Sequence, residues 1–413
     1  MQICPPDKCT GCYACVNACH FKCISMQENE YGELHPVVDE THCTHCNLCQ
    51  KSCPNNNVDL EFNYPPLCYA SWITDAQKRK ICASGGIGTI LSEFVIRQKK
   101  GVVFGSRYDE RFTPIITYTE QLDELEYFKG SRYVQSIVGN ETLLKVKDFL
   151  KSGRFVLFIG TPCQIAGLKS FLRKDYDNLI TVDLICHGVC PTKYFKEEVA
   201  YISKKKRIKN LVDVRFRGND RKNYCLSFWT GKRTGNSRCV YNKSAYTQYY
   251  FAGFLLGVSL RENCYQCHYA RPERISDITI GDFIGLGAKI PFNYPKGNVS
   301  SVTLNTNKGI CFYEEVAQNT SDLMNVQREY SERLEYKPSL VEPFHRHELN
   351  PLFREQVLKI GYLKAIRRTL KMFVWSQRMR KTLIYRITWK IIKVGRMIFY
   401  KLNLQTKPKY ISK

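Results

Sequence analysis

The sequence lacks the features that mark secreted and membrane-spanning chains. Its first residues, Met1 to Pro5, are not a cationic segment followed by an apolar stretch, so no secretory signal peptide is expected. No run approaches the roughly 18 consecutive apolar residues that a bilayer-crossing helix needs. These absences predict a cytoplasmic protein, either free or peripheral at the inner face of the membrane.

Acidic residues are scarce in the last part of the chain. The 413 residues include 62 Lys+Arg and 38 Asp+Glu, a net charge of +24. Residues 352–413 hold 17 of the basic residues and a single acid, Glu355, so this tail carries two-thirds of the net charge. Elsewhere the balance is ordinary. A content of 44% apolar and 24% charged residues excludes a disordered or collagen-like chain and predicts roughly two or three globular domains.

Cysteine, in contrast, is abundant and unevenly placed. Of the 20 cysteines, 10 lie within the first 53 residues. In a reducing compartment such dense clusters hold metal more often than they form disulfides. The head of the chain, residues 1–62, is therefore expected to be a metal-binding domain.

Two copies of one cysteine pattern occupy this head. Both have the spacing C-x2-C-x2-C-x3-C of bacterial ferredoxins, where three thiolates of one run and the last thiolate of the other bind one 4Fe-4S cluster. Zinc held by four cysteines is the alternative, but zinc sites do not need this run twice. Cys4 and Cys23 lie outside the pattern and are expected to be unligated. The pattern assigns one cluster to Cys9, Cys12, Cys15 and Cys53 and the other to Cys43, Cys46, Cys49 and Cys19.

Residues 67–340 alternate short apolar runs with helical stretches. This alternation is typical of α/β or α+β domains with a largely buried mixed sheet. A β-rich patch at 212–240 is expected to be antiparallel and half exposed. Strands are expected at 101–105, 155–159 and 179–185, and helices at 141–150 and 164–172.

A run of small residues precedes an apolar helix expected at 90–96. Small side chains in such a place let a ligand's phosphates or rings approach backbone N–H groups at the positive end of a helix. The run matches neither a P-loop nor a dinucleotide fingerprint, so an ordinary loop is the alternative. The candidate cofactor-binding residues are Ser84, Gly85, Gly86 and Gly88.

Four cysteines of the middle region lie at strand ends or in a loop. Cys163 and Cys186 each follow an expected strand, and Cys264 and Cys267 form a C-x2-C pair. Strand ends at one edge of a sheet bring such residues together, so the four could bind a third cluster. A structural zinc site and unligated thiols are the alternatives, and Cys190 could replace Cys186.

Three longer segments carry a family resemblance. Residues 158–169, 183–189 and 259–285, with the ferredoxin-type head, resemble the coenzyme F420 hydrogenase/dehydrogenase β-subunit family over about residues 1–340. The resemblance implies an FAD-binding reductase domain with its own iron–sulfur cluster, and it favours Cys186 over Cys190. It also implies contact between flavin phosphate and Lys129, Gly130 and Ser131, for which an ordinary turn is the alternative.

Two titratable residues, His187 and Asp282, lie nearest to these motifs and are the candidate catalytic residues. A histidine beside a cluster ligand can transfer a proton near neutral pH. The alternative role for His187 is a hydrogen bond to sulfur or backbone that only orients the neighbouring ligand.

Apolar residues recur at helical spacing in the tail, residues 352–413, with basic residues between them. The stripe runs from Val357 to Ile398. Such a helix can lie on an anionic membrane surface, where each cation near the headgroups contributes about 1 kcal/mol. Alternatively, the stripe packs against the protein's own core or a partner protein. Nucleic acid is the least favoured partner, because no recognised binding fold accompanies the charge.

Together these features predict an iron–sulfur flavoprotein oxidoreductase that moves electrons between the head clusters and an FAD-linked hydride donor or acceptor. Coenzyme F420 or another small organic molecule is the expected substrate class. One alternative is an electron-transfer subunit that feeds a separate redox partner protein and has no substrate site of its own. Another is a scaffold stabilised by metals. The expected architecture is a ferredoxin-like head (1–62), a mixed-sheet α/β or α+β flavin-binding reductase domain (67–340) and a basic amphipathic helical tail (352–413).

Overall fold

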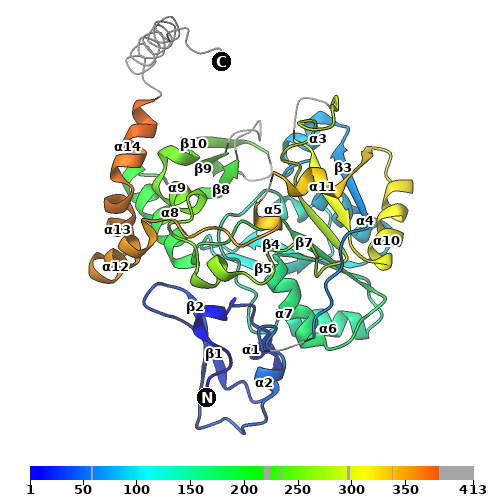
Figure 1. The fold of residues 1–413 in the computed structure, drawn as a ribbon, viewed down its shortest axis with the longest axis horizontal. Helices are drawn as coiled ribbons and strands as arrows, with labels where there is room; N and C mark the ends of the chain where they lie inside the picture. Colours follow the sequence, from blue (N-terminus) through cyan, green and yellow to red (C-terminus); the bar gives the residue numbers. More distant parts are fainter. Residues whose placement is uncertain (57–58, 218–223, 233–234, 295–297, 337, 381–413) are drawn as a thin grey trace, which may run out of the picture.

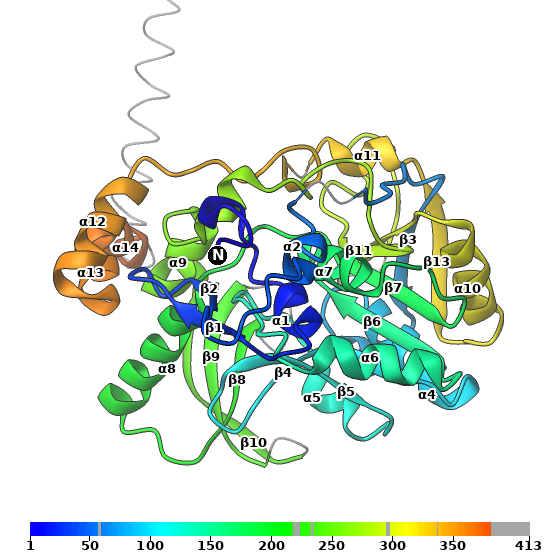
Figure 2. The same ribbon diagram turned by 90° about the horizontal axis from the view of Figure 1, so that it is seen from below.

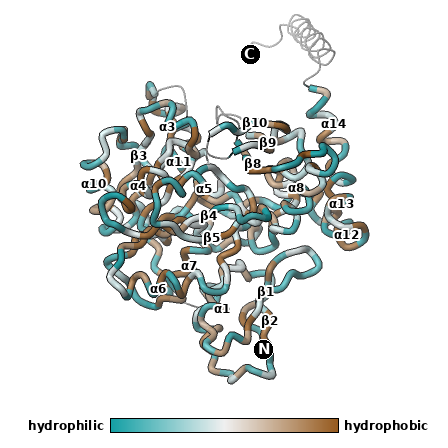
Figure 3. Tube along the Cα trace, turned by 180° about the vertical axis from the view of Figure 1, so that it is seen from behind, coloured by the Kyte–Doolittle hydropathy of each residue, from teal (hydrophilic) through white to brown (hydrophobic). Residues whose placement is uncertain are grey.

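The computed structural model describes residues 1–56, 59–217, 224–232, 235–294, 298–336 and 338–380 (Figure 1). A small N-terminal head lies against a larger body that contains the main sheet, and the C-terminal helices flank one side of the body. Hydrophobic stretches of the chain gather in the interior of the body (Figure 3). No helix among the described residues is long and apolar enough to cross a bilayer.

The head is built from two short helices and a hairpin. Strands β1 and β2 pair antiparallel, with Ile24 opposite Val38. Helix α1 contacts α2 and also packs on helix α7 of the body. The elements are a 3₁₀ turn (Pro6–Lys8), α1 (Ala14–Ala18), β1 (Ile24–Glu28), β2 (Leu34–Val38) and α2 (Leu48–Lys51).

Eight strands form the main sheet, in the order β13-β3-β12-β11-β7-β6-β4-β5. The central strands β11, β7, β6 and β4 run parallel, and the other neighbours pair antiparallel. The sheet is therefore mixed, as expected. Its strands are β3 (Leu67–Ile73), β4 (Val102–Tyr108), β5 (Pro114–Thr119), β6 (Val156–Gly160), β7 (Leu179–Leu184), β11 (Ile278–Asp282), β12 (Ser300–Leu304) and β13 (Leu323–Arg328).

Helices cover both faces of this sheet (Figure 2). Helices α4 and α10 pack on one face, whereas α6, α7 and the head pack on the other. The chain crosses from β3 to β4 through α4 and returns strand by strand through β6 and β7 to β11. Open sheets of this kind bind ligands beyond the carboxyl ends of their parallel strands. The helices are α3 (Ala76–Lys80), α4 (Ile87–Gln98), α5 (Leu125–Phe128), α6 (Thr142–Lys151), α7 (Pro162–Leu172), α10 (Asn307–Gln318) and α11 (Tyr330–Leu334).

The strands expected at 101–105, 155–159 and 179–185 correspond to β4, β6 and β7. The helices expected at 90–96, 141–150 and 164–172 lie within or over α4, α6 and α7. The apolar pattern predicted these elements because each strand is buried on both faces and each helix buries one stripe.

A second, three-stranded antiparallel sheet has the order β10-β9-β8, as expected for the patch at 212–240. One face of this sheet joins a separate hydrophobic core with α8, α9 and the C-terminal helices. The elements are α8 (Thr192–Lys206), β8 (Leu211–Arg217), β9 (Tyr224–Gly231), β10 (Ser237–Ser244), α9 (Tyr249–Leu255), α12 (Asn350–Ile360), α13 (Tyr362–Thr369) and α14 (Lys371–Met379), with 3₁₀ turns at Ala245–Thr247, Glu262–Gln266 and Pro338–Leu340.

The first part of the tail packs against this second core. Val357, Ile366, Leu370 and Val374, all members of the apolar stripe, are buried there. Of the two alternatives for the stripe, packing on the protein's own core therefore holds for α12, α13 and α14. The rest of the stripe, to Ile398, lies outside the described residues, and its contact with an anionic membrane stays a prediction.

Charged residues tie the head to the body. The backbone N–H of Glu262 donates to Glu33 Oε1 (3.1 Å), and Arg354 of α12 pairs with the same carboxylate (3.0 Å). Burial by itself would raise the pKa of Glu33, but His35, Arg261 and Arg354 lower it to about 2. The carboxylate thus stays ionised, and its stabilising contribution is lost only as the pH falls from the ordinary glutamate range towards 2.

Candidate functional site

The two cysteine runs of the head have the same backbone conformation. Gly11 and Tyr13, on either side of Cys12, both have φ of 64°. His45 and Asn47, at the equivalent places around the second cysteine of the other run, have φ of 54° and 59°. Residues other than glycine seldom adopt this left-handed conformation. Its repetition at matching positions shows that both runs form the same kind of ligand-binding loop.

The thiols group as the ferredoxin spacing predicts. The pKa of Cys15 is raised by burial, then by Cys12, Cys9 and Cys53, and least by Cys49 of the other group. The pKa of Cys49 is likewise raised by burial and then by Cys19 and Cys46. The last cysteine of each run thus lies with the first three of the other, which is the exchange that two neighbouring 4Fe-4S clusters require.

Each group also has an extra thiol beside it, which the spacing did not reveal. The Sγ atoms of Cys19 and Cys23 are 3.3 Å apart. Cys4 forms hydrogen bonds with the thiols of Cys53 and Cys9, which raise its pKa. In the sequence, Cys4 and Cys23 each lie within five residues of a predicted cluster ligand, but they stand outside the repeated cysteine pattern. That pattern therefore did not predict which thiols they contact. Each cluster site therefore has a fifth sulfur within reach.

The four middle cysteines come from three parts of the body. Cys163 is the second residue of α7 after β6, Cys186 follows β7, and Cys264 and Cys267 lie in and after a 3₁₀ turn. Burial raises the pKa of Cys264, and Cys267 and Cys186 raise it further. Burial and then Cys163 raise the pKa of Cys267 to about 11. All four thiols therefore belong to one electrostatic neighbourhood, as a third cysteine site requires.

Cys190, the alternative to Cys186, is not among the thiols that act on Cys264 or Cys267. It is fully buried and its Sγ contacts Ser259 Oγ at 3.3 Å within the second core. Cys186, in contrast, lines a cavity of the body and its Sγ accepts from the backbone N–H of Gly188 (3.4 Å). The geometry favours Cys186 as the fourth member of the set.

Helix α7 joins the head to this third cysteine site. Gly167 lies one helical turn after Cys163, and a Cβ atom there would meet Cys12 Sγ at 2.9 Å. Only glycine therefore lets the loop around the first head cluster pack so closely on α7. Burial raises the pKa of Tyr269, and Cys163 and Cys12 raise it further. Tyr269 therefore lies within electrostatic reach of both groups of thiols. Cys12 of the head packs against α7, the helix that carries Cys163.

A fully buried arginine occupies the same junction. Arg261 is 0% exposed, and its guanidinium donates to Gln135 Oε1 (2.7 Å) and to the backbone oxygens of Cys9 (3.1 Å) and Leu34 (3.2 Å). Its charge acts to lower the pKa of Cys9 and of Cys163. A buried cation between two sets of thiolates stabilises the negative charge that iron–sulfur ligation brings.

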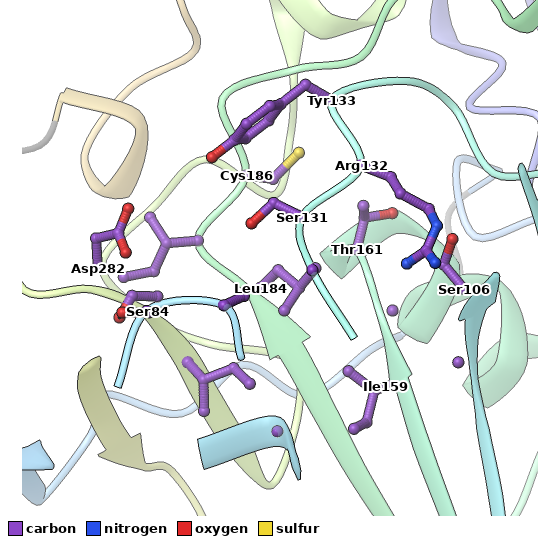
Figure 4. A pocket seen from close by; sticks show the side chains of 18 of the residues that line it. Ser84, Ser106, Ser131, Arg132, Tyr133, Ile159, Thr161, Leu184, Cys186 and Asp282 are labelled. Carbon is purple, nitrogen blue, oxygen red and sulfur yellow. The ribbon is translucent and has the colours of Figure 1, made fainter. Parts of the chain in front are cut away.

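A cavity of about 320 Å³ lies beyond the carboxyl ends of the parallel strands and beside the first turn of α4 (Figure 4). It receives residues from the loop before α4, the loop after α5 and the ends of β6, β7 and β11. The third cysteine site opens into it through Cys186. The predicted site residues that line this cavity are Ser84, Gly88, Lys129, Gly130, Ser131, Cys186, His187 and Asp282.

Gly85 and Gly86, also predicted to bind a cofactor, do not line the cavity. A Cβ atom at Gly85 would meet the backbone oxygen of Ser71 at 2.3 Å, and one at Gly86 would meet Ile73 Cδ1 at 2.4 Å. Gly86 also has φ of 91°. Only glycine fits at these two positions, because the loop packs closely against β3. The two glycines therefore have a packing role, which the sequence alone could not distinguish from ligand binding.

Asp282, a predicted catalytic residue, is held by several donors. Arg217 donates to both carboxylate oxygens (3.2 and 2.5 Å), and the Tyr224 hydroxyl donates at 2.9 Å. Burial alone would raise the pKa of Asp282, but Arg217 lowers it overall. The group is therefore a fixed anion near neutral pH. Arg217 also donates to the Tyr133 hydroxyl (2.9 Å), so four cavity residues, Asp282, Arg217, Tyr224 and Tyr133, share one network.

His187, the other predicted catalytic residue, faces aromatic rings. Its ring centroid lies 4.8 Å from that of Phe254 and 4.0 Å from that of Phe344. Its Nε2 lies 3.2 Å from the backbone oxygen of Phe254. This contact corresponds to the orienting role that was the alternative to proton transfer, and it leaves His187 at the cavity wall next to Cys186.

Arg333 of α11 is a buried cavity residue with hydrogen-bond donors that a ligand could use. It is 1% exposed, and its Nε and one terminal nitrogen have no hydrogen-bond partner among the described residues. Burial lowers its pKa to about 10, so it remains charged. Asp282 acts on this charge electrostatically, but buried N–H donors without a hydrogen-bond partner remain costly unless a ligand accepts from them. The donor set therefore fits an anionic group, such as a phosphate, in this cavity.

Two family models match the chain, one in the head and one in the body. Residues 153–326 match the family model for the C-terminal part of the coenzyme F420 hydrogenase/dehydrogenase β subunit, and residues 8–57 match a 4Fe-4S dicluster domain. The chain therefore combines an N-terminal 4Fe-4S dicluster domain with a region of the coenzyme F420 hydrogenase/dehydrogenase β-subunit type. The match of residues 8–57 identifies the head as an iron–sulfur domain of the kind that carries single electrons. No curated protein matches the sequence.

Among solved structures, one similar chain comes from the F420-reducing [NiFe] hydrogenase complex of Methanosarcina barkeri. The two share 17% identity with a TM-score of 0.40, and the match covers 75% of this chain and 92% of that one. The part matched to the β-subunit family includes all four middle cysteines, His187 and Asp282. The loop before α4, Lys129 and Arg333 lie outside it, so their place at the cavity rests on the structure alone.

Proposed function

We propose that this chain is an iron–sulfur flavoprotein oxidoreductase of the β-subunit type, located in the cytoplasm. It moves electrons between the two head clusters and an FAD in the cavity, where a hydride is exchanged with coenzyme F420 or another small organic molecule. The observation that carries the proposal is the continuity of the sites. The first head cluster packs on α7 beside the third cysteine site, and that site opens through Cys186 into the cavity.

The residues of the cavity fit a flavin nucleotide. The unpaired guanidinium of Arg333 and the first turn of α4 are suited to its phosphates, as is the backbone at Gly130, where a Cβ atom would meet nothing within 4 Å. Lys129 is the weaker candidate because it already pairs with Glu126. When bound, a flavin supplies the conversion between two-electron hydride chemistry and the single electrons that clusters carry.

The remaining cavity residues have supporting roles in this proposal. The network of Asp282, Arg217 and Tyr224 places a paired carboxylate and guanidinium at one wall and fixes the end of β11. Apolar and aromatic residues, such as Ile159, Leu184 and Phe254, complete the wall and limit the access of water. His187 keeps the segment after Cys186 in place and can hold a proton at its imidazole.

The second candidate function is an electron-transfer subunit without a substrate site of its own. The family's description as a subunit favours it, since a subunit acts with a partner protein. The two candidates differ in what the isolated chain can do. The first exchanges a hydride without a partner protein, whereas the second has no site at which to exchange one.

A screen of hydride donors separates the two candidates. The purified chain is mixed anaerobically with reduced F420, NADH or NADPH, and the flavin absorbance is followed. The first proposal predicts bleaching of the flavin by at least one donor, followed by slower reduction of the clusters. If the chain contains a flavin but neither reduced F420 nor NADH nor NADPH bleaches it, the isolated chain has no hydride-exchange site. The chain is then an electron-transfer subunit that serves a separate catalytic partner.

A further inference from the structure

A second cavity, of about 1020 Å³, lies among α8, β10, α9, α13 and α14, on the side of the body that carries the C-terminal helices (Figure 1). It shares no lining residue with the cavity beyond the main sheet. Basic side chains dominate its wall, with one carboxylate, Glu198, among them. The basic residues are Lys205, Lys206, Lys243, Arg367, Arg368, Lys371 and Arg378.

The one carboxylate does not neutralise this wall. Glu198 is 2% exposed and is bound by Arg367, whose terminal nitrogen lies 3.0 and 3.1 Å from its two oxygens. Gln248 also donates to it at 2.9 Å. Among the described residues no carboxylate forms an ion pair with the remaining lysines of the wall or with Arg368. The cavity therefore concentrates positive charge that nothing in the described chain offsets.

Several of these cations are held in place by aromatic rings. The Arg367 guanidinium lies 4.0 Å from the ring centroid of Tyr201, and Arg378 lies 5.3 Å from that of Tyr249. Arg378 also donates to the backbone oxygen of Thr247 (3.1 Å). Stacked and hydrogen-bonded guanidinium groups lose little further freedom when an anion binds. Arg367 and Arg378 are thus preorganised donors, and the exposed cations beside them, Arg368 and Lys371, add further positive charge.

We propose that this basic cavity binds a phosphate-bearing anion with at least two negative charges, such as a diphosphate. Arginine forks match phosphate oxygens, and charge-assisted hydrogen bonds from several directions favour a divalent anion over a single carboxylate. A soluble phosphate compound and a lipid headgroup share this chemistry. The exposed Met372 (69%) and Trp375 (55%), on the same helix as Lys371, are placed to enter a lipid layer if the source is a lipid.

The test uses the full chain and two probes. Inorganic pyrophosphate is titrated by calorimetry, and sedimentation is measured with vesicles of phosphatidylcholine that contain phosphatidic acid. The variant Arg368→Ala/Lys371→Ala removes two exposed cations of the wall that form no ion pair with any described residue. We expect it to weaken binding about tenfold or more, because it removes two of the cations that would contact the anion. A rise in ionic strength should weaken binding of the native chain as well.

The matched control is Lys196→Ala/Lys364→Ala, which removes two exposed cations from α8 and α13 outside the cavity wall. It should bind both probes as the native chain does, and neither variant should change iron or flavin content. Binding of pyrophosphate identifies a soluble ligand, and binding of vesicles alone identifies a lipid headgroup. The proposal is wrong if neither probe binds, or if the control weakens binding as much as the cavity variant.

Discussion

Replacement of Cys267 by alanine is expected to remove one iron–sulfur cluster and leave the other two intact. Iron should fall from about twelve to about eight atoms per chain, because a 4Fe-4S cluster needs four thiolates. Cys267 is only partly buried and lies in a loop after a 3₁₀ turn, so its loss leaves the strands of the sheet in place. The flavin should still be bound and still be bleached by a hydride donor, but its electrons should no longer reach the head clusters.

The measurement combines iron analysis with anaerobic spectra that follow flavin and cluster reduction separately. The control is Cys190→Ala, because Cys190 is a buried cysteine four residues from Cys186 whose Sγ contacts Ser259 and whose thiol does not act on Cys264 or Cys267. It should keep its full iron content and its electron transfer. Unchanged iron in Cys267→Ala, or an equal loss of iron in the control, contradicts the assignment of the third site.

The second large effect is expected at Arg333. The variant Arg333→Met should bind flavin at least about a hundredfold more weakly, because two charge-assisted hydrogen bonds to phosphate contribute about 3–6 kcal/mol in total. The flavin-free variant should nevertheless be more stable to unfolding by roughly 1–3 kcal/mol, because it no longer buries unsatisfied donors. A loss of flavin affinity together with a gain in stability distinguishes a ligand-binding arginine from a structural one.

Arg328 offers a matched control on a neighbouring element. Its side chain donates to both oxygens of Glu332 (2.7 and 2.8 Å), which is 1% exposed. Arg328→Met should therefore lower stability, since it leaves a buried carboxylate without its partner, and flavin affinity should not change. Denaturant unfolding of the flavin-free proteins and flavin titration measure the two quantities. If Arg333→Met loses stability and keeps its flavin affinity, Arg333 does not bind the cofactor.

Much of the architecture could be predicted from local patterns. The head ligands follow from spacing, because a cubane accepts three closely spaced thiolates and one distant one. The strands β4, β6 and β7 follow from short apolar runs, because a strand buried on both faces has no polar positions to alternate. The loop at Ser84 was found because small residues before an apolar helix mark a possible approach to its backbone.

Other parts of the site had no local signal. Arg217 and Tyr224 lie on strands of the second sheet, and Arg333 lies on α11, yet all three line the cavity. Such contacts depend on how distant elements pack, which neither periodicity nor spacing records. The tail shows the same limit. An amphipathic stripe suits a membrane surface and a protein core equally well, and only the burial of Val357 and Ile366 shows which applies to its first part.

The central claim is that three clusters and a flavin share this chain. The most direct test is anaerobic purification followed by iron, acid-labile sulfide, zinc and flavin analysis. We expect about twelve irons, an equal amount of sulfide and one FAD per chain. Stoichiometric zinc without flavin would show that the metals only stabilise the fold, and it would contradict the claim.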